Sequence, residues 1–445
     1  MNGRWKKHLF ITSSTERNNK KAINSFVLHG PGDEPERAAH DAEKRQIFMN
    51  MTEAEKSALH LAEKAQAAAS RQEYLQAADL FADAAAINRL QVTLQWKYRN
   101  QQALMLAEFG REFRNNEALE QATGLYEKTV LELAPKSERP DDWATTQHNF
   151  GNALGLLGQR QRATRNLERA IMVFENALTV RSPEKSPLEW AATQDNYGNV
   201  LGILGQRRGD VDMLKKSVEA FEKALTERSR EKVPMDWAAT MNNLGTALQV
   251  LAQREKDPRL LKRSVDAYTD VLKEWTRKRA PLNWASTFNN LGMALRLLGE
   301  TRKGPRTLEQ SVSAFNNALA VRTRESVPMD WAMTQNNLGA ALQSLGNRQE
   351  DARLLEKAVT AYENALSEIT REKLPMAWAM TLANLGAVHM KLAERSGNAD
   401  VALAALNEFD EVVEFFRLAS HAQYMELAED QRKKAQALVM ALSTP

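Results

Sequence analysis

The sequence predicts an all-α protein folded as an α-solenoid of about eight helix pairs, because three series of residues recur along the chain. Each series keeps a spacing of 47 residues. They are the tryptophans Trp143, Trp190, Trp237, Trp284, Trp331 and Trp378, the prolines Pro140, Pro187, Pro234, Pro281, Pro328 and Pro375, and the aromatic residues Phe174, Phe221, Tyr268, Phe315, Tyr362 and Phe409. Such a period is typical of helical units that bury their apolar faces by stacking on one another.

Each unit reads as two helices, as the segment that begins at Pro328 illustrates. Proline suits the first helical turn, and the apolar residues that follow lie on one helical face. They are Trp331, Leu338, Leu342 and Leu345. Gly346 is the predicted end of this first helix. A second apolar stripe follows a short polar loop and predicts the second helix, with Leu355, Ala358, Val359, Tyr362 and Leu366.

The repeat also suggests how the chain is divided. Residues 51–92 form a short unit, residues 93–418 form the array of 47-residue units, and residues 419–445 form a capping helix with a tail. The last of these is rich in charges, as the exposed end of a stacked array requires. Residues 1–50 contain no repeat and are expected to be a basic, flexible segment.

The detailed pattern distinguishes between repeat families of similar length. A two-helix unit of this size also fits HEAT or armadillo repeats. The first helix, however, carries L-G-x-x-L at Leu338, Gly339 and Leu342, and the second carries small-x3-aromatic-x2-small at Ala358, Tyr362 and Ala365. This pattern resembles the tetratricopeptide repeat, and the long unit with its "NNLG" helix resembles the kinesin light chain branch and its bacterial relatives. The resemblance implies a right-handed solenoid whose first helices line a concave surface.

An asparagine stands two residues before the repeat glycine in all six long units: Asn149, Asn196, Asn243, Asn290, Asn337 and Asn384. Asparagine is a poor helix former, so its recurrence needs a reason. Its amide both donates and accepts hydrogen bonds, as a peptide group does. The resemblance implies a ladder that holds an extended peptide, with Asn242, Asn289 and Asn336 beside it. The alternative is that each asparagine bonds to its neighbouring repeat, and both roles are compatible.

The surface around these asparagines is expected to be nearly neutral. The residues at the neighbouring positions are small or polar, and only Asp195 and Arg296 carry a full charge. A phosphate-binding surface would place many lysines and arginines there, so nucleic acid is a disfavoured partner.

Arginines follow the first helix in each unit: Arg160, Arg207, Arg254, Arg302, Arg348 and Arg395. They suggest either a basic edge for an acidic partner or RNA, or contacts of each arginine with the negative C-terminal end of its own helix or with a carboxylate of the next unit. The second interpretation is favoured.

Several classes of function find no support in the residues. The chain has no cysteine, and its 7 histidines lack metal-ligand spacing, so neither a metal nor another cofactor is expected. No nucleotide-binding or hydrolase motif is present, which argues against an enzyme. No apolar run is long enough to span a membrane, and no secretory segment opens the sequence, so a cytoplasmic protein is expected.

Three functional hypotheses remain. The first is a non-enzymatic scaffold that binds a linear peptide segment of a partner protein in the concave groove. The second is a regulatory or sensor subunit that controls a separate effector enzyme. The third is an RNA- or anion-binding solenoid that uses the loop arginines. The sequence identifies neither the partner nor the oligomeric state, because fold-level analogy supports protein binding and nothing finer.

Overall fold

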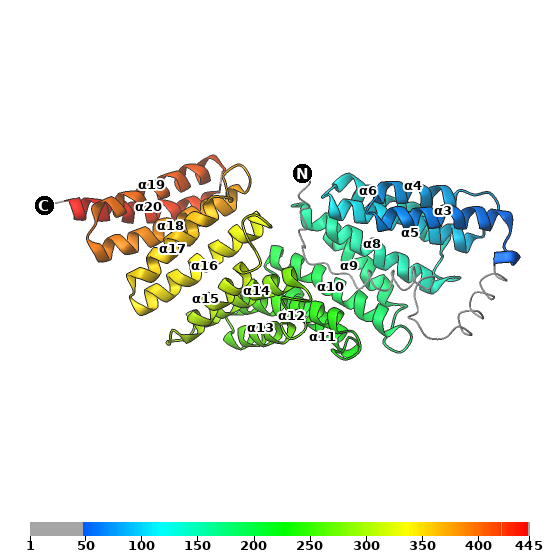
Figure 1. The fold of residues 1–445 in the computed structure, drawn as a ribbon, viewed down its shortest axis with the longest axis horizontal. Helices are drawn as coiled ribbons and strands as arrows, with labels where there is room; N and C mark the ends of the chain where they lie inside the picture. Colours follow the sequence, from blue (N-terminus) through cyan, green and yellow to red (C-terminus); the bar gives the residue numbers. More distant parts are fainter. Residues whose placement is uncertain (1–47, 420, 444–445) are drawn as a thin grey trace. The chain divides into compact units, whose positions relative to one another are not determined.

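The computed structural model describes residues 48–419 and 421–443, and in them every regular element is a helix (Figure 1). The helices form eight consecutive pairs followed by a single helix, α20. The predicted all-α solenoid with a C-terminal capping helix is therefore confirmed. Most of the predicted flexible segment, residues 1–47, lies outside the described residues.

The chain forms two compact units, which meet in sequence between Thr240 and Met241. The N-terminal unit contains α3 (Glu53–Ser70) with α4 (Tyr74–Ala85), α5 (Val92–Glu112) with α6 (Asn116–Leu125), α8 (Pro140–Arg160) with α9 (Arg165–Leu178), and α10 (Pro187–Arg208) with α11 (Val211–Glu227). A π-helix, η1 (Tyr126–Val130), and the short α7 (Leu131–Leu133) continue from α6.

The boundary between the units lies within α12 (Pro234–Glu255). The C-terminal unit continues with α13 (Pro258–Val271), α14 (Pro281–Glu300) with α15 (Arg306–Leu319), α16 (Pro328–Gln349) with α17 (Ala352–Leu366), α18 (Pro375–Ser396) with α19 (Ala399–Leu418), and α20 (Ala422–Ser443).

Helix starts follow the predicted pattern, as α16 shows. Pro328 occupies the first turn, where its missing N–H costs nothing, and the backbone N–H of Trp331 donates to the carbonyl of Val327. The second helix, α17, buries Leu355, Ala358 and Tyr362 as its stripe predicts.

The expected end at Gly346 is wrong, because α16 continues to Gln349 and ends at Glu350, whose φ of 54° is left-handed. Gly346 lies inside the helix for a packing reason. A Cβ at this position would come within 2.9 Å of Leu355 Cδ2 on α17, so the glycine allows the two helices to approach closely.

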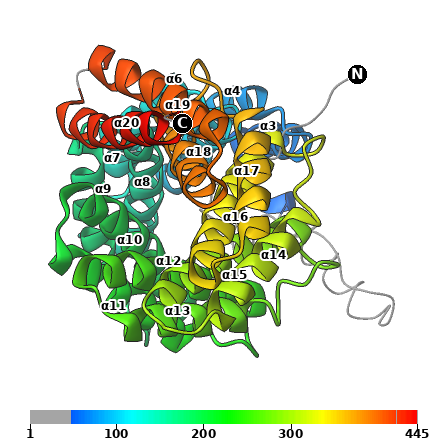
Figure 2. The same cartoon turned by 90° about the vertical axis from the view of Figure 1, so that its left-hand side faces the viewer.

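Stacking continues from one pair to the next within each unit. The repeat glycine of α16, Gly339, lies against the ring of Tyr362, where an added Cβ would stand 2.8 Å from Cε1. In the C-terminal unit, α15 packs on α16 and α17 packs on α18. At the end of the array α20 lies beside α19 in both views (Figures 1 and 2), and Ala435 of α20 is buried against Ala405 and Phe409. This contact covers the last repeat.

Candidate functional site

The six repeated asparagines lie on the first helices of their pairs, and their exposure divides them into two groups. Asn149 on α8, Asn196 on α10 and Asn243 on α12 are buried, with 6%, 4% and 8% of their surface exposed. Asn290 on α14, Asn337 on α16 and Asn384 on α18 are partly exposed. The same sequence position is therefore differently accessible in different repeats.

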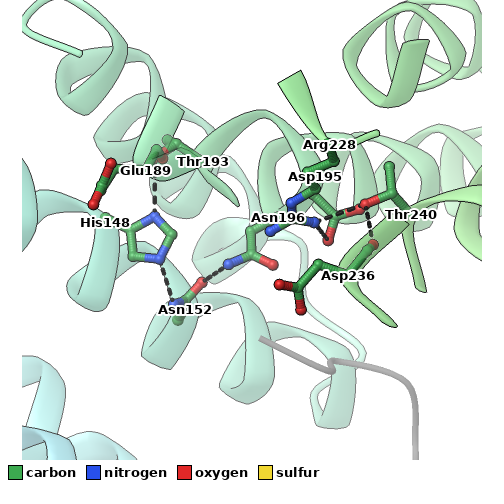
Figure 3. Close-up of polar contacts among 9 residues, drawn as sticks. All are labelled: His148, Asn152, Glu189, Thr193, Asp195, Asn196, Arg228, Asp236 and Thr240. Atoms are coloured by element: carbon green, nitrogen blue, oxygen red, sulfur yellow. Dashed lines mark hydrogen bonds and ion pairs between the residues drawn. The ribbon is translucent and has the colours of Figure 1, made fainter. Parts of the chain in front are cut away.

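The two buried asparagines of the N-terminal unit join consecutive repeats. Asn149 Nδ2 donates to Asn100 Oδ1 on α5 over 3.3 Å. Asn196 Nδ2 donates to Asn152 Oδ1 on α8 over 2.7 Å (Figure 3). These two hydrogen bonds join neighbouring repeats. They correspond to the alternative role of the asparagines, in which each one bonds to its neighbouring repeat.

His148 orients this network. Its Nε2 lies 3.2 Å from Asn152 Nδ2 and its Nδ1 lies 3.1 Å from Thr193 Oγ1 (Figure 3). The amide N–H of Asn152 can only donate, so Nε2 accepts and the proton of the neutral ring lies on Nδ1. Burial, together with the charges of Arg181 and Arg228, holds the pKa of His148 well below its ordinary value of 6.5. The ring is therefore a neutral link between α8 and α10.

A buried ion pair lies beside this network. Arg228 Nη1 is 3.5 Å from the carboxylate of Asp195, and both side chains are only 2% exposed. The same nitrogen donates to Thr240 Oγ1 over 2.7 Å (Figure 3). Asp195 was expected at the groove surface, but it is buried because Arg228 neutralises it.

Arg181 occupies the equivalent place one repeat earlier. It donates to Thr193 Oγ1 over 2.8 Å and to Thr145 Oγ1 over 3.1 Å. Burial lowers its pKa to about 10, so it remains a cation at neutral pH. The equivalent positions in the C-terminal unit hold Trp275, Arg322 and Ile369.

A threonine series was overlooked in the sequence, although a threonine stands three residues after each repeated tryptophan. Each Oγ1 donates to the backbone carbonyl four residues earlier, and most also contact a polar group of a neighbouring segment. The series comprises Thr146, Thr193, Thr240, Thr287, Thr334 and Thr381, all buried. These hydroxyls give the buried arginines and amides a partner inside the array.

The asparagines of the C-terminal unit have fewer constraints. Asn337 Nδ2 donates to Asn289 Oδ1 over 3.0 Å, and Asn289 Nδ2 is 3.5 Å from Asn290 Oδ1. Thr381 Oγ1 contacts Asn336 Oδ1 over 3.1 Å. No side-chain hydrogen bond involves Asn384 within the described residues. Asn242, predicted beside the groove, is instead 1% exposed and is contacted by Thr287.

Two of the recurrent arginines, Arg160 and Arg207, bind the ends of helices, whereas Arg302 bonds Thr307 of its own repeat. Arg207 donates to the carbonyls of Gly158, Gln159 and Gln161, where α8 of the preceding repeat ends, over 2.8 to 2.9 Å. Arg160 reaches the carbonyls of Gly110 and Arg111 in the same way. The C-terminal end of a helix is electronegative, so these contacts are favourable. The favoured helix-end role is therefore seen, but at the preceding repeat and not at the arginine's own helix.

Two other kinds of site are absent from the described part of the chain. Among those residues, no group of three acidic, histidine or cysteine side chains is placed to hold a metal ion. Their helices are also too short or too polar to cross a membrane.

Comparisons with known proteins agree with the repeat pattern. Residues 143–184 and 331–369 match the family model of the tetratricopeptide repeat. A search of curated proteins found no match for this chain.

Several solved structures are similar in fold. The apo form of RapI is 12% identical, with a TM-score of 0.46 over 86% of this chain and 98% of that chain. YrrB, described as a repeat protein with an unusual peptide-binding site, is 21% identical, with a TM-score of 0.34 over 54% and 96%. A protein described as a putative kinesin light chain from Podospora anserina is 20% identical, with a TM-score of 0.35 over 50% and 96%.

The two matched segments correspond to the pairs α8 with α9 and α16 with α17, one in each unit. Helix pairs of the same 47-residue period continue between and around them, so the chain contains tetratricopeptide repeats.

Proposed function

We propose that this chain is a non-enzymatic protein-interaction scaffold that binds a linear peptide segment of a partner protein. The proposed contact surface is the asparagine face of the C-terminal unit, which we define as Asn290, Asn337 and Asn384 with their neighbours Asn289 and Asn336.

The observation that carries the proposal is the partial exposure of one asparagine on each of three consecutive first helices. Helix α14 contacts α16, and α16 contacts α18, so the three amides follow one another across neighbouring helices. Each amide offers a donor and an acceptor, the pair of groups that a peptide main chain also presents. Such a row favours a ligand recognised mainly through its backbone.

The charge of this surface favours a peptide over a polyanion. The residue after the repeat glycine is Met293, Ala340 or Ala387 on these three helices. Arg296, the one charged residue predicted on this face, is bonded to Glu300 of the same helix. A nucleic acid would need uncompensated cations to displace its counterions.

The experiment is a selection of random linear peptides, displayed on phage, against the full chain. The test variant changes Asn290, Asn337 and Asn384 to alanine. A matched control changes Asn316, Asn317 and Asn364 to alanine, since these lie on the second helices α15 and α17 of the same unit. Wild type and control should enrich related peptides, and the test variant should bind those peptides at least about tenfold more weakly.

Circular dichroism must show that both variants keep their helical content. The proposal is wrong if wild type enriches no peptide family, or if the test and control variants bind the selected peptides with equal affinity.

A further inference from the structure

We infer that the C-terminal unit holds an apolar side chain of the bound peptide on two exposed methionines, Met333 of α16 and Met380 of α18. We call these two residues the methionine subsite. The inference rests on the proposed peptide-binding function and gives it a specificity, namely a preference for a leucine-sized apolar residue over a polar one at one position of the peptide.

The two methionines occupy a repeat position that is small in the earlier units. Two residues after the repeated tryptophan, the six long units carry Thr145, Ala192, Ala239, Ser286, Met333 and Met380. Ala192, Ala239 and Ser286 are 6%, 3% and 7% exposed, whereas Met333 is 39% and Met380 is 53% exposed. Large apolar side chains therefore stand at the surface only at this position of the last two long units.

A second change in the same repeats explains this exposure. In α14 the position is covered by Arg322, whose Nη2 donates to Ser286 Oγ over 2.8 Å. The residues that correspond to Arg322 in the next two repeats are Ile369 and Phe416, and both are buried. Since apolar core residues stand in place of the arginine, the two methionines remain in contact with solvent.

The methionine subsite borders the asparagine face. An α-helix turns by about 100° per residue, so Met333 lies one turn before Asn336 and Asn337 and falls between them in angle around α16. On the neighbouring helix, Thr381 follows Met380 directly and contacts Asn336 Oδ1 over 3.1 Å. Helices α16 and α18 are also in contact, so the two methionines lie beside the same stretch of the asparagine face.

Asn337 can hold the backbone of the peptide residue whose side chain reaches the subsite. Its Nδ2 donates to Asn289 Oδ1 over 3.0 Å, and its Oδ1 accepts no hydrogen bond within the described residues. A peptide N–H can therefore donate to this oxygen. Because successive side chains of an extended peptide point to opposite sides, every second side chain near Asn337 lies on the side of Met333.

The side chain that fits is apolar and uncharged. Methionine is flexible and polarisable, so its surface adapts to apolar side chains of different shape. A leucine placed on the two methionines removes apolar surface of both partners from water, which a glutamine of similar size does to a smaller extent. Asp330 is the charged residue nearest to Met333 along α16, so an acidic side chain would meet a like charge.

The first test titrates two blocked pentapeptides into the full chain labelled with ¹³C at the methionine methyl groups. The peptides are acetyl-Ala-Ala-Leu-Ala-Ala-amide and its glutamine analogue, acetyl-Ala-Ala-Gln-Ala-Ala-amide. The methyl resonances of Met333 and Met380, assigned by their loss in Met333→Leu and Met380→Leu, should shift saturably with the leucine peptide. The glutamine peptide should bind at least about fivefold more weakly.

Methionine variants serve as test and control. The double variant Met333→Gln with Met380→Gln should lose the preference for leucine and bind the glutamine peptide within about twofold of wild type. Met172→Gln, on the second helix α9 of the N-terminal unit, changes a methionine that is 55% exposed and should keep the preference.

The inference is overturned if the leucine peptide causes no saturable shift of the two methyl resonances, if wild type binds both peptides equally, or if the double variant keeps the preference. It is also overturned if the two resonances change with the concentration of the chain alone, since a second copy of the chain would then occupy the surface.

The variant with Asn290, Asn337 and Asn384 changed to alanine separates this inference from the proposed function. If that variant binds both pentapeptides more weakly while wild type shows no preference for leucine, the methionine subsite alone is contradicted. If the leucine preference and the affinity are unchanged in that variant, the proposed role of the asparagines alone is contradicted.

Discussion

The asparagine two residues before the repeat glycine has different surroundings in the two units. In the N-terminal unit Asn149 and Asn196 are buried and bonded to the preceding repeat. In the C-terminal unit Asn243 of α12 is buried as well, whereas Asn290, Asn337 and Asn384 are partly exposed. The recurrent helical position is therefore buried in the first three long repeats and partly exposed in the last three, where Asn337 still bonds to the preceding repeat.

The neighbouring residues also differ. The residue before the asparagine is His148 or Asp195 in the N-terminal unit, and Asn242, Asn289, Asn336 or Ala383 in the C-terminal unit. His148 and Asp195 engage buried partners, which draws the adjacent amides into the interior. The comparison teaches that the repeat motif fixes where an asparagine stands but does not by itself decide whether its amide is buried.

The largest expected effect comes from breaking the buried ion pair. Asp195→Ala leaves Arg228 as an uncompensated buried cation and should lower the free energy of unfolding by about 3–5 kcal/mol. The equivalent change in the C-terminal unit, Asn289→Ala, should cost less than about 1.5 kcal/mol, since it removes neutral hydrogen bonds. Urea unfolding followed by circular dichroism measures both, and equal costs would contradict the comparison.

The threonine series should show the same asymmetry at a smaller scale. Thr193→Val removes a partner from both Arg181 and His148, so it should cost about 2–3 kcal/mol. Thr381→Val removes the contact with Asn336 and the bond to the carbonyl of Ala377, but no contact with a charged group, and should cost about 1 kcal/mol. Thermal unfolding of the two single variants tests this order, and a reversed order would show that the arginine contacts contribute little.

Acid should weaken the network of the N-terminal unit through His148. Because its folded pKa is below the unfolded value, the unfolded chain takes up a proton more readily. The stabilisation is complete above about pH 6.5 and declines as the pH falls, by at most about 1.4 kcal/mol per pH unit. Urea midpoints at several pH values measure this decline, which should be smaller in His148→Gln. If stability declines equally with falling pH in wild type and in His148→Gln, a group other than His148 is responsible.

The smallest expected effect concerns the helix ends. Arg160 is partly buried and donates to two carbonyls and to Asn116 Oδ1, so Arg160→Ala should cost about 1–1.5 kcal/mol. Arg348 bonds only the carbonyl of Arg302 in the C-terminal unit, so Arg348→Ala should cost less than about 1 kcal/mol. Differential scanning calorimetry of both variants measures the loss of stability. A larger loss for Arg348→Ala than for Arg160→Ala would contradict the prediction.

The sequence predicted the helix pairs because local signals set them. Pro328 begins a helix and Tyr362 packs against Gly339 in the same unit, so both signals lie within one repeat. The threonine series was equally readable from its spacing. The pair of Asp195 and Arg228 was not, because it joins residues that do not share a repeat position.

The contact of Arg207 with the end of α8 bears on how a repeat chain gains or loses repeats during evolution. Here one repeat supplies the group that satisfies the carbonyls of the repeat before it, and Arg160 does the same one repeat earlier. A gene duplication or deletion that adds or removes a whole repeat therefore brings a new donor together with each new set of acceptors. Recombination between repeats conserves these bonds, whereas an insertion of any other length separates a donor from its acceptors.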